Sequence, residues 1–154
     1  MRSPAFRGGR WAAKTVSMSD FPITGGCLCG ALRYEARAEP IYAGLCYCAD
    51  CRKASGSGFI PFMGFQAEHL TITGETRQSH VPSFSGGTAT RNHCAHCGSM
   101  VFGGVLGESD EHTIYAGSLD DPSCFRPEIC LFTRDRPAWA EVKAGLIEFE
   151  TMPH

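Results

Sequence analysis

Apolar and polar side chains alternate along several short stretches of this chain, and glycine or proline separates one stretch from the next. Residues 31–36 show the pattern clearly, because apolar side chains at the even positions alternate with Arg33 and Glu35. A repeat of two residues is typical of a β-strand with one buried face. No segment of any length keeps an apolar period of 3.6 residues. The sequence therefore predicts a mainly β protein with at most one or two short helical turns.

Eight further stretches are predicted as strands, each bounded by turn-forming residues. The run 59–65 is the most apolar and is predicted as a buried strand, whereas Ser55-Gly56-Ser57-Gly58 before it interrupts the chain. The other predicted strands are 41–45, 69–73, 76–79, 88–92, 100–102, 112–115 and 129–132.

The segment Ser118-Leu119-Asp120-Asp121-Pro122 is interpreted as a turn or the start of a short helix. Aspartate before proline favours turns, and an aspartate side chain readily caps the first turn of a helix. Asp120 or Asp121 is the expected cap. Carboxylate chemistry or metal binding is the less favoured alternative.

The length of 154 residues fits one domain, which we place at residues 20–154. No apolar run approaches the roughly 18 residues that a membrane span needs. Residues 1–19 carry basic residues before the first acid at position 20, a composition that resembles an organelle transit peptide. Pro4, Gly8 and Gly9 oppose the amphipathic helix of such a peptide, so we expect a flexible N-terminal extension, with Met18 as the effective beginning of the protein.

The nine cysteines cannot all be paired within one chain, because their number is odd. Seven of them occur in groups with metal-ligand spacing, and no secretory signal precedes them. Cysteines grouped as metal ligands rather than paired in disulfides predict a reducing, cytoplasmic environment. The balance of 14 basic to 16 acidic residues argues against nucleic acid as a partner.

The cluster Cys46-Tyr47-Cys48-Ala49-Asp50-Cys51 places three thiols within six residues. Zinc is the usual metal of such thiolate groups, and three protein ligands leave its fourth position open to water or a substrate. Two alternatives stand beside this prediction of a catalytic type of site. A fourth protein ligand could close the site, or the cysteines could be buried thiols without a metal.

Two further pairs of cysteines predict a second, closed site. Cys94-Ala95-His96-Cys97-Gly98 resembles half of a zinc knuckle, and Cys27-Leu28-Cys29-Gly30 supplies another pair. Pairing the two gives a four-thiolate structural zinc site that would contribute folding energy. The alternatives are that one pair binds nothing, or that the clusters hold iron and sulfur, although the usual iron–sulfur spacings differ.

Three stretches of the chain together support a resemblance to a known family. They are Gly25-Gly26-Cys27-Leu28-Cys29-Gly30-Ala31-Leu32-Arg33-Tyr34, Cys46-Tyr47-Cys48-Ala49-Asp50-Cys51-Arg52-Lys53-Ala54-Ser55-Gly56 and Arg91-Asn92-His93-Cys94-Ala95-His96-Cys97-Gly98-Ser99. In this order they resemble the glutathione-dependent formaldehyde-activating enzyme family, which includes the centromere protein V group. Leu119 to Pro122, Pro127 and Trp139 also fall where that family has similar residues.

The resemblance implies an Mss4-like fold of short antiparallel strands around two zinc ions. It implies a structural zinc on the two cysteine pairs and a functional zinc on the three-cysteine cluster. The implied ligands are Cys27, Cys29, Cys94 and Cys97 for the first ion, and Cys46, Cys48 and Cys51 for the second. The implied activity is a carbon–sulfur lyase or synthase reaction between glutathione and formaldehyde.

Residues near the three-cysteine cluster are expected to influence which thiol binds there. Arg52 and Lys53 follow the cluster and are candidates to bind the carboxylates of a glutathione-like thiol, although they could equally be a solvated surface pair. Tyr47 and Cys130 stand where the family often has histidine, and we expect both to reshape the pocket beside the second zinc. Cys124, and Cys130 apart from its expected effect on the pocket, are interpreted as small buried residues. The rival function is a non-catalytic zinc module that binds a thiol or a protein partner.

Overall fold

The computed structural model describes residues 21–141 and 144–153, so the predicted extension at residues 1–19 lies outside the described residues. Three short strands form one antiparallel sheet in the order β1-β2-β5: β1 Ile23–Gly26, β2 Arg33–Ala36 and β5 Leu70–Thr73. A larger sheet has the order β11-β10-β3-β4-β9-β8-β7-β6. Its strands are β3 Tyr42–Cys46, β4 Ile60–Gln66, β6 Thr76–Pro82, β7 Thr88–Cys94, β8 Met100–Gly103, β9 Glu111–Tyr115, β10 Ile129–Leu131 and β11 Ile147–Glu148.

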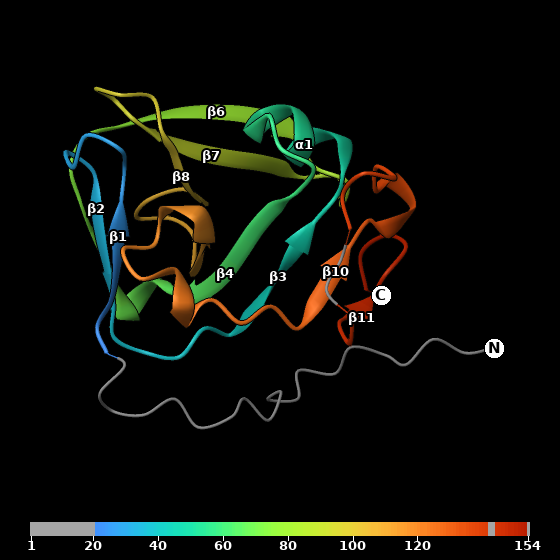
Figure 1. Ribbon diagram of the computed structural model, residues 1–154. Coiled ribbons are helices and arrows are strands. Elements are labelled where there is room, and N and C mark those ends of the chain that lie inside the picture. The colour runs from blue at the N-terminus through green and yellow to red at the C-terminus, as the bar shows by residue number, and fades with distance from the viewer. Residues whose placement is uncertain (1–20, 142–143, 154) are drawn as a thin grey trace.

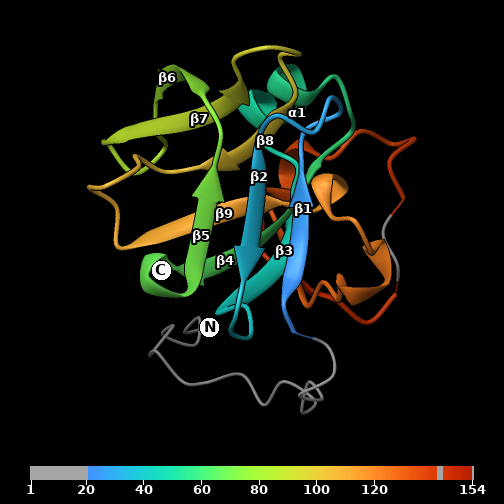
Figure 2. The ribbon, with the colours of Figure 1, turned by 90° about the vertical axis from the view of Figure 1, so that its left-hand side faces the viewer.

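The small sheet packs across one face of the large one, and its strands cross those of β4 and β9 at a steep angle (Figure 2). Alternate side chains of β2 point into the space between the sheets, as the two-residue repeat predicts. The buried core there includes Leu32, Tyr34 and Ala36 from the small-sheet side and Phe65 and Phe102 from the large sheet. This core holds the two sheets together.

The far end of the large sheet departs from the antiparallel arrangement that was predicted. β10 pairs with both β3 and β11 in the parallel direction, whereas the other paired strands are antiparallel. The contact with β3 is close because Gly44 lies opposite Ile129. A Cβ atom at Gly44 would lie 2.6 Å from the Ile129 side chain and 2.7 Å from its carbonyl oxygen. Glycine at this position therefore allows β10 to reach β3.

The helical content of the described residues is small, as predicted. The helix α1 covers Ala49–Ser55 and lies near β7 at one end of the molecule (Figure 1). Single 3₁₀ turns cover Ala67–His69, Ala116–Ser118, Pro122–Cys124 and Thr133–Asp135. Asp121 caps the third of these turns by accepting a hydrogen bond from the Ser123 N–H at 2.9 Å, which confirms the predicted cap.

All nine predicted strands are present, and the mainly β class is confirmed for the part of the chain that the structure describes. The strands β1 and β11 and the helix α1 were not predicted individually. Within the described residues, no helix is long and apolar enough to cross a membrane.

Candidate metal centres

The two predicted cysteine pairs lie together in space. The sulfur atoms of Cys27, Cys29, Cys94 and Cys97 all lie within 4.8 Å of one another. The sulfurs of Cys27 and Cys29 are 3.6 Å apart, and those of Cys29 and Cys94 are 3.8 Å apart. A tetrahedral zinc with Zn–S bonds of about 2.3 Å separates its sulfurs by about 3.8 Å, so the donor set fits zinc.

Two tight turns present these sulfurs. Cys27 and Cys29 belong to the connection between β1 and β2, where Gly30 has a φ of 82°. Cys94 ends β7, and Gly98, with a φ of 76°, returns its N–H to the Cys94 carbonyl at 3.0 Å. The Ser99 hydroxyl lies 3.1 Å from the Cys97 sulfur and accepts from the Leu28 N–H at 3.1 Å. Hydrogen bonds from the side chain and the backbone of Ser99 to the Cys97 sulfur lower the pKa of Cys97 to about 5, which favours the thiolate that a metal requires.

The second cluster forms where β3 passes into α1. Cys46 is the last residue of β3, Cys48 is the N-cap of α1 and Cys51 lies in the first turn of the helix. The Cys48 sulfur accepts a hydrogen bond from the Cys51 N–H at 3.3 Å, which turns Cys51 back toward the strand. All three sulfurs lie within 4.8 Å of one another. In residues 21–141 and 144–153, no fourth His, Cys, Asp or Glu ligand atom joins this group.

The three thiols influence one another strongly. Hydrogen bonds from Cys46 and Cys51 lower the pKa of Cys48, while the hydrogen bonds of Cys46 with Cys48 and Cys51 raise the pKa of Cys46. Like charges held this close cannot all be ionised without a compensating cation. A divalent soft metal supplies that compensation, and the three-sulfur donor set fits zinc with one position that no described residue takes.

A buried arginine already contributes positive charge to the second cluster. Arg91 of β7 is only 7% exposed, and its Nη2 donates to the Cys51 sulfur at 3.8 Å. Burial alone would lower the pKa of Arg91, but the contact with Cys51 reverses this and raises the pKa. The Nε of Arg91 is buried and has no hydrogen-bond partner among the described residues. Sequence reasoning did not identify Arg91 as a site residue.

A cavity of about 570 Å³ opens beside the second cluster. Cys46, Cys51 and Arg91 form part of its wall, and the remaining lining comes from strands of the large sheet, the loop after β8 and the last described residues. A ligand in this cavity can therefore approach the sulfur atoms. The four-cysteine cluster does not line the cavity.

Two tyrosines of the cavity keep their protons at neutral pH. Burial raises the pKa of Tyr115, and it also raises that of Tyr42, whose hydroxyl lies 3.2 Å from the Thr113 hydroxyl. The Tyr115 hydroxyl lies against Gly103, where a Cβ would come within 3.1 Å of it. Tyr115 is thus a hydrogen-bond donor beside Arg91 that the sequence did not indicate.

The two cations expected to bind a thiol's carboxylates lie on α1. Arg52 is partly buried, and its Nε donates to the Tyr47 carbonyl at 3.2 Å, while Lys53 is exposed. Neither side chain lines the cavity beside the cluster. Their role in binding remains a prediction.

Tyr47 and Cys130 lie on the opposite side of the sheet from the cavity, contrary to the expectation that they reshape the pocket. Both are fully buried and pack with Leu45 and Ala140. Leu45 faces the side opposite to Cys46, as successive strand residues do, and neither Leu45 nor Tyr47 lines the cavity. Cys124 is only half-buried, and its sulfur donates to the Asp121 carbonyl at 2.9 Å.

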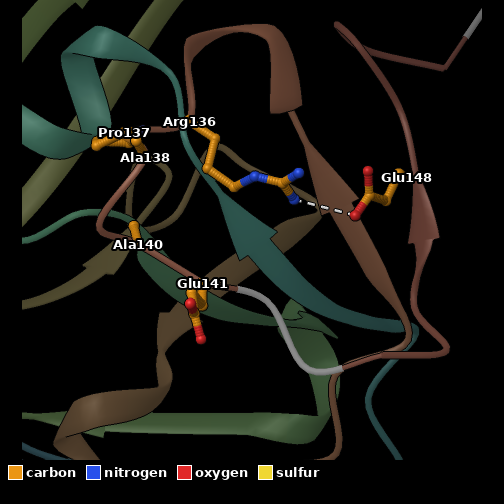
Figure 3. A pocket seen from close by; sticks show the side chains of 6 residues that line it. All are labelled: Arg136, Pro137, Ala138, Ala140, Glu141 and Glu148. Atoms are coloured by element: carbon orange, nitrogen blue, oxygen red, sulfur yellow. Dashed lines mark hydrogen bonds and ion pairs between the residues drawn. The ribbon is translucent and has the colours of Figure 1, made fainter.

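A second cavity, of about 400 Å³, lies on this other side and contains no cysteine (Figure 3). Arg136 and Glu148 line it and form an ion pair at 3.0 Å. The Arg136 guanidinium also lies 5.7 Å from the centre of the Tyr47 ring. The chemistry of the metal clusters is therefore absent from this cavity.

Comparison with known proteins agrees with the two cysteine clusters. The chain is similar to a crystal structure of a Rhodobacter sphaeroides protein, a structural genomics target, with 19% sequence identity, a TM-score of 0.47 and coverage of 64% of this chain and 88% of that one. No curated protein matches the sequence. The family described as glutathione-dependent formaldehyde-activating enzyme matches residues 22–135, which include all seven clustered cysteines. The chain therefore belongs to the glutathione-dependent formaldehyde-activating enzyme family.

Proposed function

We propose that the protein binds two zinc ions and uses the second to make or break a carbon–sulfur bond between formaldehyde and glutathione or a related small thiol. The observation that carries the proposal is the position of Cys46 and Cys51 on the wall of the 570 Å³ cavity. A three-thiolate site that a small molecule can reach is typical of catalytic rather than structural zinc. Family membership supports the thiol and the aldehyde as reactants.

Zinc with an open position would keep a bound thiol deprotonated near neutral pH. Arg91 offsets the negative charge of the cysteine thiolates, and the cavity wall beside them is mainly apolar. In the synthetic direction the thiol sulfur bonds to the aldehyde carbon as the carbonyl π bond breaks. The thiol proton is released and the former carbonyl oxygen gains a proton, so no oxidant is needed. Tyr115, which lines the cavity, would donate a hydrogen bond to that oxygen.

The test measures adduct formation above the spontaneous reaction, because thiols add to formaldehyde without help. The zinc-loaded protein should raise the initial rate in proportion to its concentration, and Cys51→Ser should abolish the increase. Cys124→Ser is the matched control, since this cysteine belongs to neither cluster. Tyr115→Phe should retain its zinc but lower the rate by about 100-fold, as expected for loss of a positioned proton donor.

The second candidate is a non-catalytic zinc module that binds a thiol or a protein partner. The ease of the uncatalysed reaction favours this candidate, because little acceleration is required of the protein. A thiol that perturbs the second metal without any rate above background would support the module and contradict the enzyme. We also propose a cytoplasmic location, because the nine cysteines form no disulfides.

A further inference from the structure

We infer that the cavity beside the second cluster prefers a thiol with an uncharged, apolar body over glutathione. The inference rests on the proposed function and names the substrate class of the same site. It follows from the kinds of side chain that line the cavity and from the charges they carry.

The wall is mainly apolar and comes from several separate elements. Strands β4 and β10, the loop after β8 and the end of the described chain each contribute. The larger apolar side chains of the wall are Ile60, Phe62, Val105, Ile129, Leu131 and Met152. An alkyl or aryl group placed here would leave water for apolar contacts, and its binding would become tighter with each apolar group that it buries.

The charges of the wall do not suit a carboxylate. Arg91 and Glu111 are the charged residues among those that line the cavity, apart from the cysteine sulfurs. Arg91 donates one hydrogen bond to the Cys51 sulfur, and its unpartnered Nε is buried, so that atom is not exposed to an incoming carboxylate. Glu111 is exposed, accepts a hydrogen bond from Gln66 at 3.3 Å and would repel an incoming carboxylate.

Glutathione brings two carboxylates, and an unpaired carboxylate is costly to move out of water. Arg52 and Lys53, the cations expected to pair with them, lie outside the cavity wall. The volume of about 570 Å³ falls within the range of ordinary small-molecule pockets. Charge rather than size is therefore the feature that disfavours glutathione.

The first experiment compares the binding of phenylmethanethiol and of glutathione to the zinc-loaded protein by calorimetry at one pH. The triple variant Cys46→Ser, Cys48→Ser, Cys51→Ser serves to identify binding at the second cluster. We expect phenylmethanethiol to bind at least about tenfold more tightly than glutathione. Equal or tighter binding of glutathione would overturn the inference and leave the proposed function standing. Failure of both thiols to bind would overturn the proposed function as well.

The second experiment changes the charge of the wall. Val105→Arg adds a cation inside the cavity, and Leu106→Arg adds the same charge at the next residue, which is exposed and does not line the cavity. Val105→Arg should shift the preference toward glutathione by about tenfold, as one charge-assisted hydrogen bond would. An equal shift in Leu106→Arg, or no shift in Val105→Arg, would contradict the argument from charge.

Discussion

The guanidinium Nη2 of Arg91 donates a hydrogen bond to the Cys51 sulfur across 3.8 Å. The arginine comes from β7 and the cysteine from the first turn of α1, so the contact joins two elements that are distant in the sequence. It also places a permanent positive charge beside three thiols that must ionise together to bind a metal.

Arg91→Gln should therefore weaken zinc binding at the second cluster by about 10- to 100-fold, the usual effect of losing a partner that contacts a metal ligand. Competition with a chromogenic chelator measures the affinity. Arg52→Gln removes the same charge from α1, outside the cavity wall, and should leave the affinity nearly unchanged. If both variants lose zinc affinity equally, the loss comes from the change in net charge and not from the contact between Arg91 and Cys51.

The two cysteine clusters should differ in what they do for the fold. The four-cysteine cluster joins the β1–β2 connection to the β7–β8 connection, and so links the two sheets. Replacing Cys46, Cys48 and Cys51 by serine should remove one of two zinc ions and leave the protein folded. Replacing Cys27, Cys29, Cys94 and Cys97 should unfold it, because structural zinc contributes folding energy.

Metal analysis and circular dichroism of both variants measure these outcomes. Unfolding of the triple variant would remove the main support for a functional second site.

Gly44→Ala tests the close approach of β10 to β3. The new methyl group would collide with the side chain and carbonyl of Ile129, so the free energy of unfolding should fall by about 1–3 kcal/mol. Urea denaturation of the zinc-loaded protein measures it. Gly117→Ala is the control, because a Cβ there meets no atom within 4 Å, and it should change stability by less than about 0.5 kcal/mol.

The ion pair between Arg33 and Asp120 predicts a small dependence of stability on pH. The Arg33 Nη1 donates to Asp120 Oδ1 at 2.9 Å, and the Thr24 hydroxyl donates to Oδ2 at 2.8 Å. Arg33 is the main cause that lowers the pKa of Asp120 below its ordinary value. The stabilisation is therefore complete above the unfolded pKa of about 3.9 and is lost as the pH falls through the lower folded value.

Both side chains of this pair are more than one-third exposed, so the effect should not exceed about 1 kcal/mol. The difference in unfolding free energy between the native protein and Asp120→Asn, followed from pH 6 to pH 3, measures it. A difference that stays constant over this range would contradict the prediction.

The strands could be predicted because their signal is local. In β2 every second side chain is buried, so one window of sequence contains the pattern. The helix α1 has seven residues and none of them is buried, so it offers no apolar period to detect. Its ends depend instead on the Cys48 side chain and on Gly56, which has a φ of 67°. The strand β11 has only two residues and forms through its pairing with β10.

The cysteine clusters were predictable for a similar reason, since the spacing of ligands is written along the chain. The role of Arg91 could not be predicted from the sequence, because it depends on which strand lies beside α1. The residues 90 to 92 are all buried next to an irregularity in the pairing of β7 with β8, so alternation does not reveal where Arg91 points. The sequence showed basic residues adjacent to the cluster, and the fold supplies the cation from a distant strand.

The strand β10 separates two environments, with Ile129 and Leu131 on the wall of the metal cavity and Cys130 packed with Tyr47 beneath Arg136. Divergence among relatives at positions 47 and 130 can therefore proceed without altering what a bound thiol touches. Selection for a new substrate would act on positions 129 and 131 instead. Relatives grouped by the residues at 47 and 130 need not share a substrate, whereas those grouped by 129, 131 and 105 should.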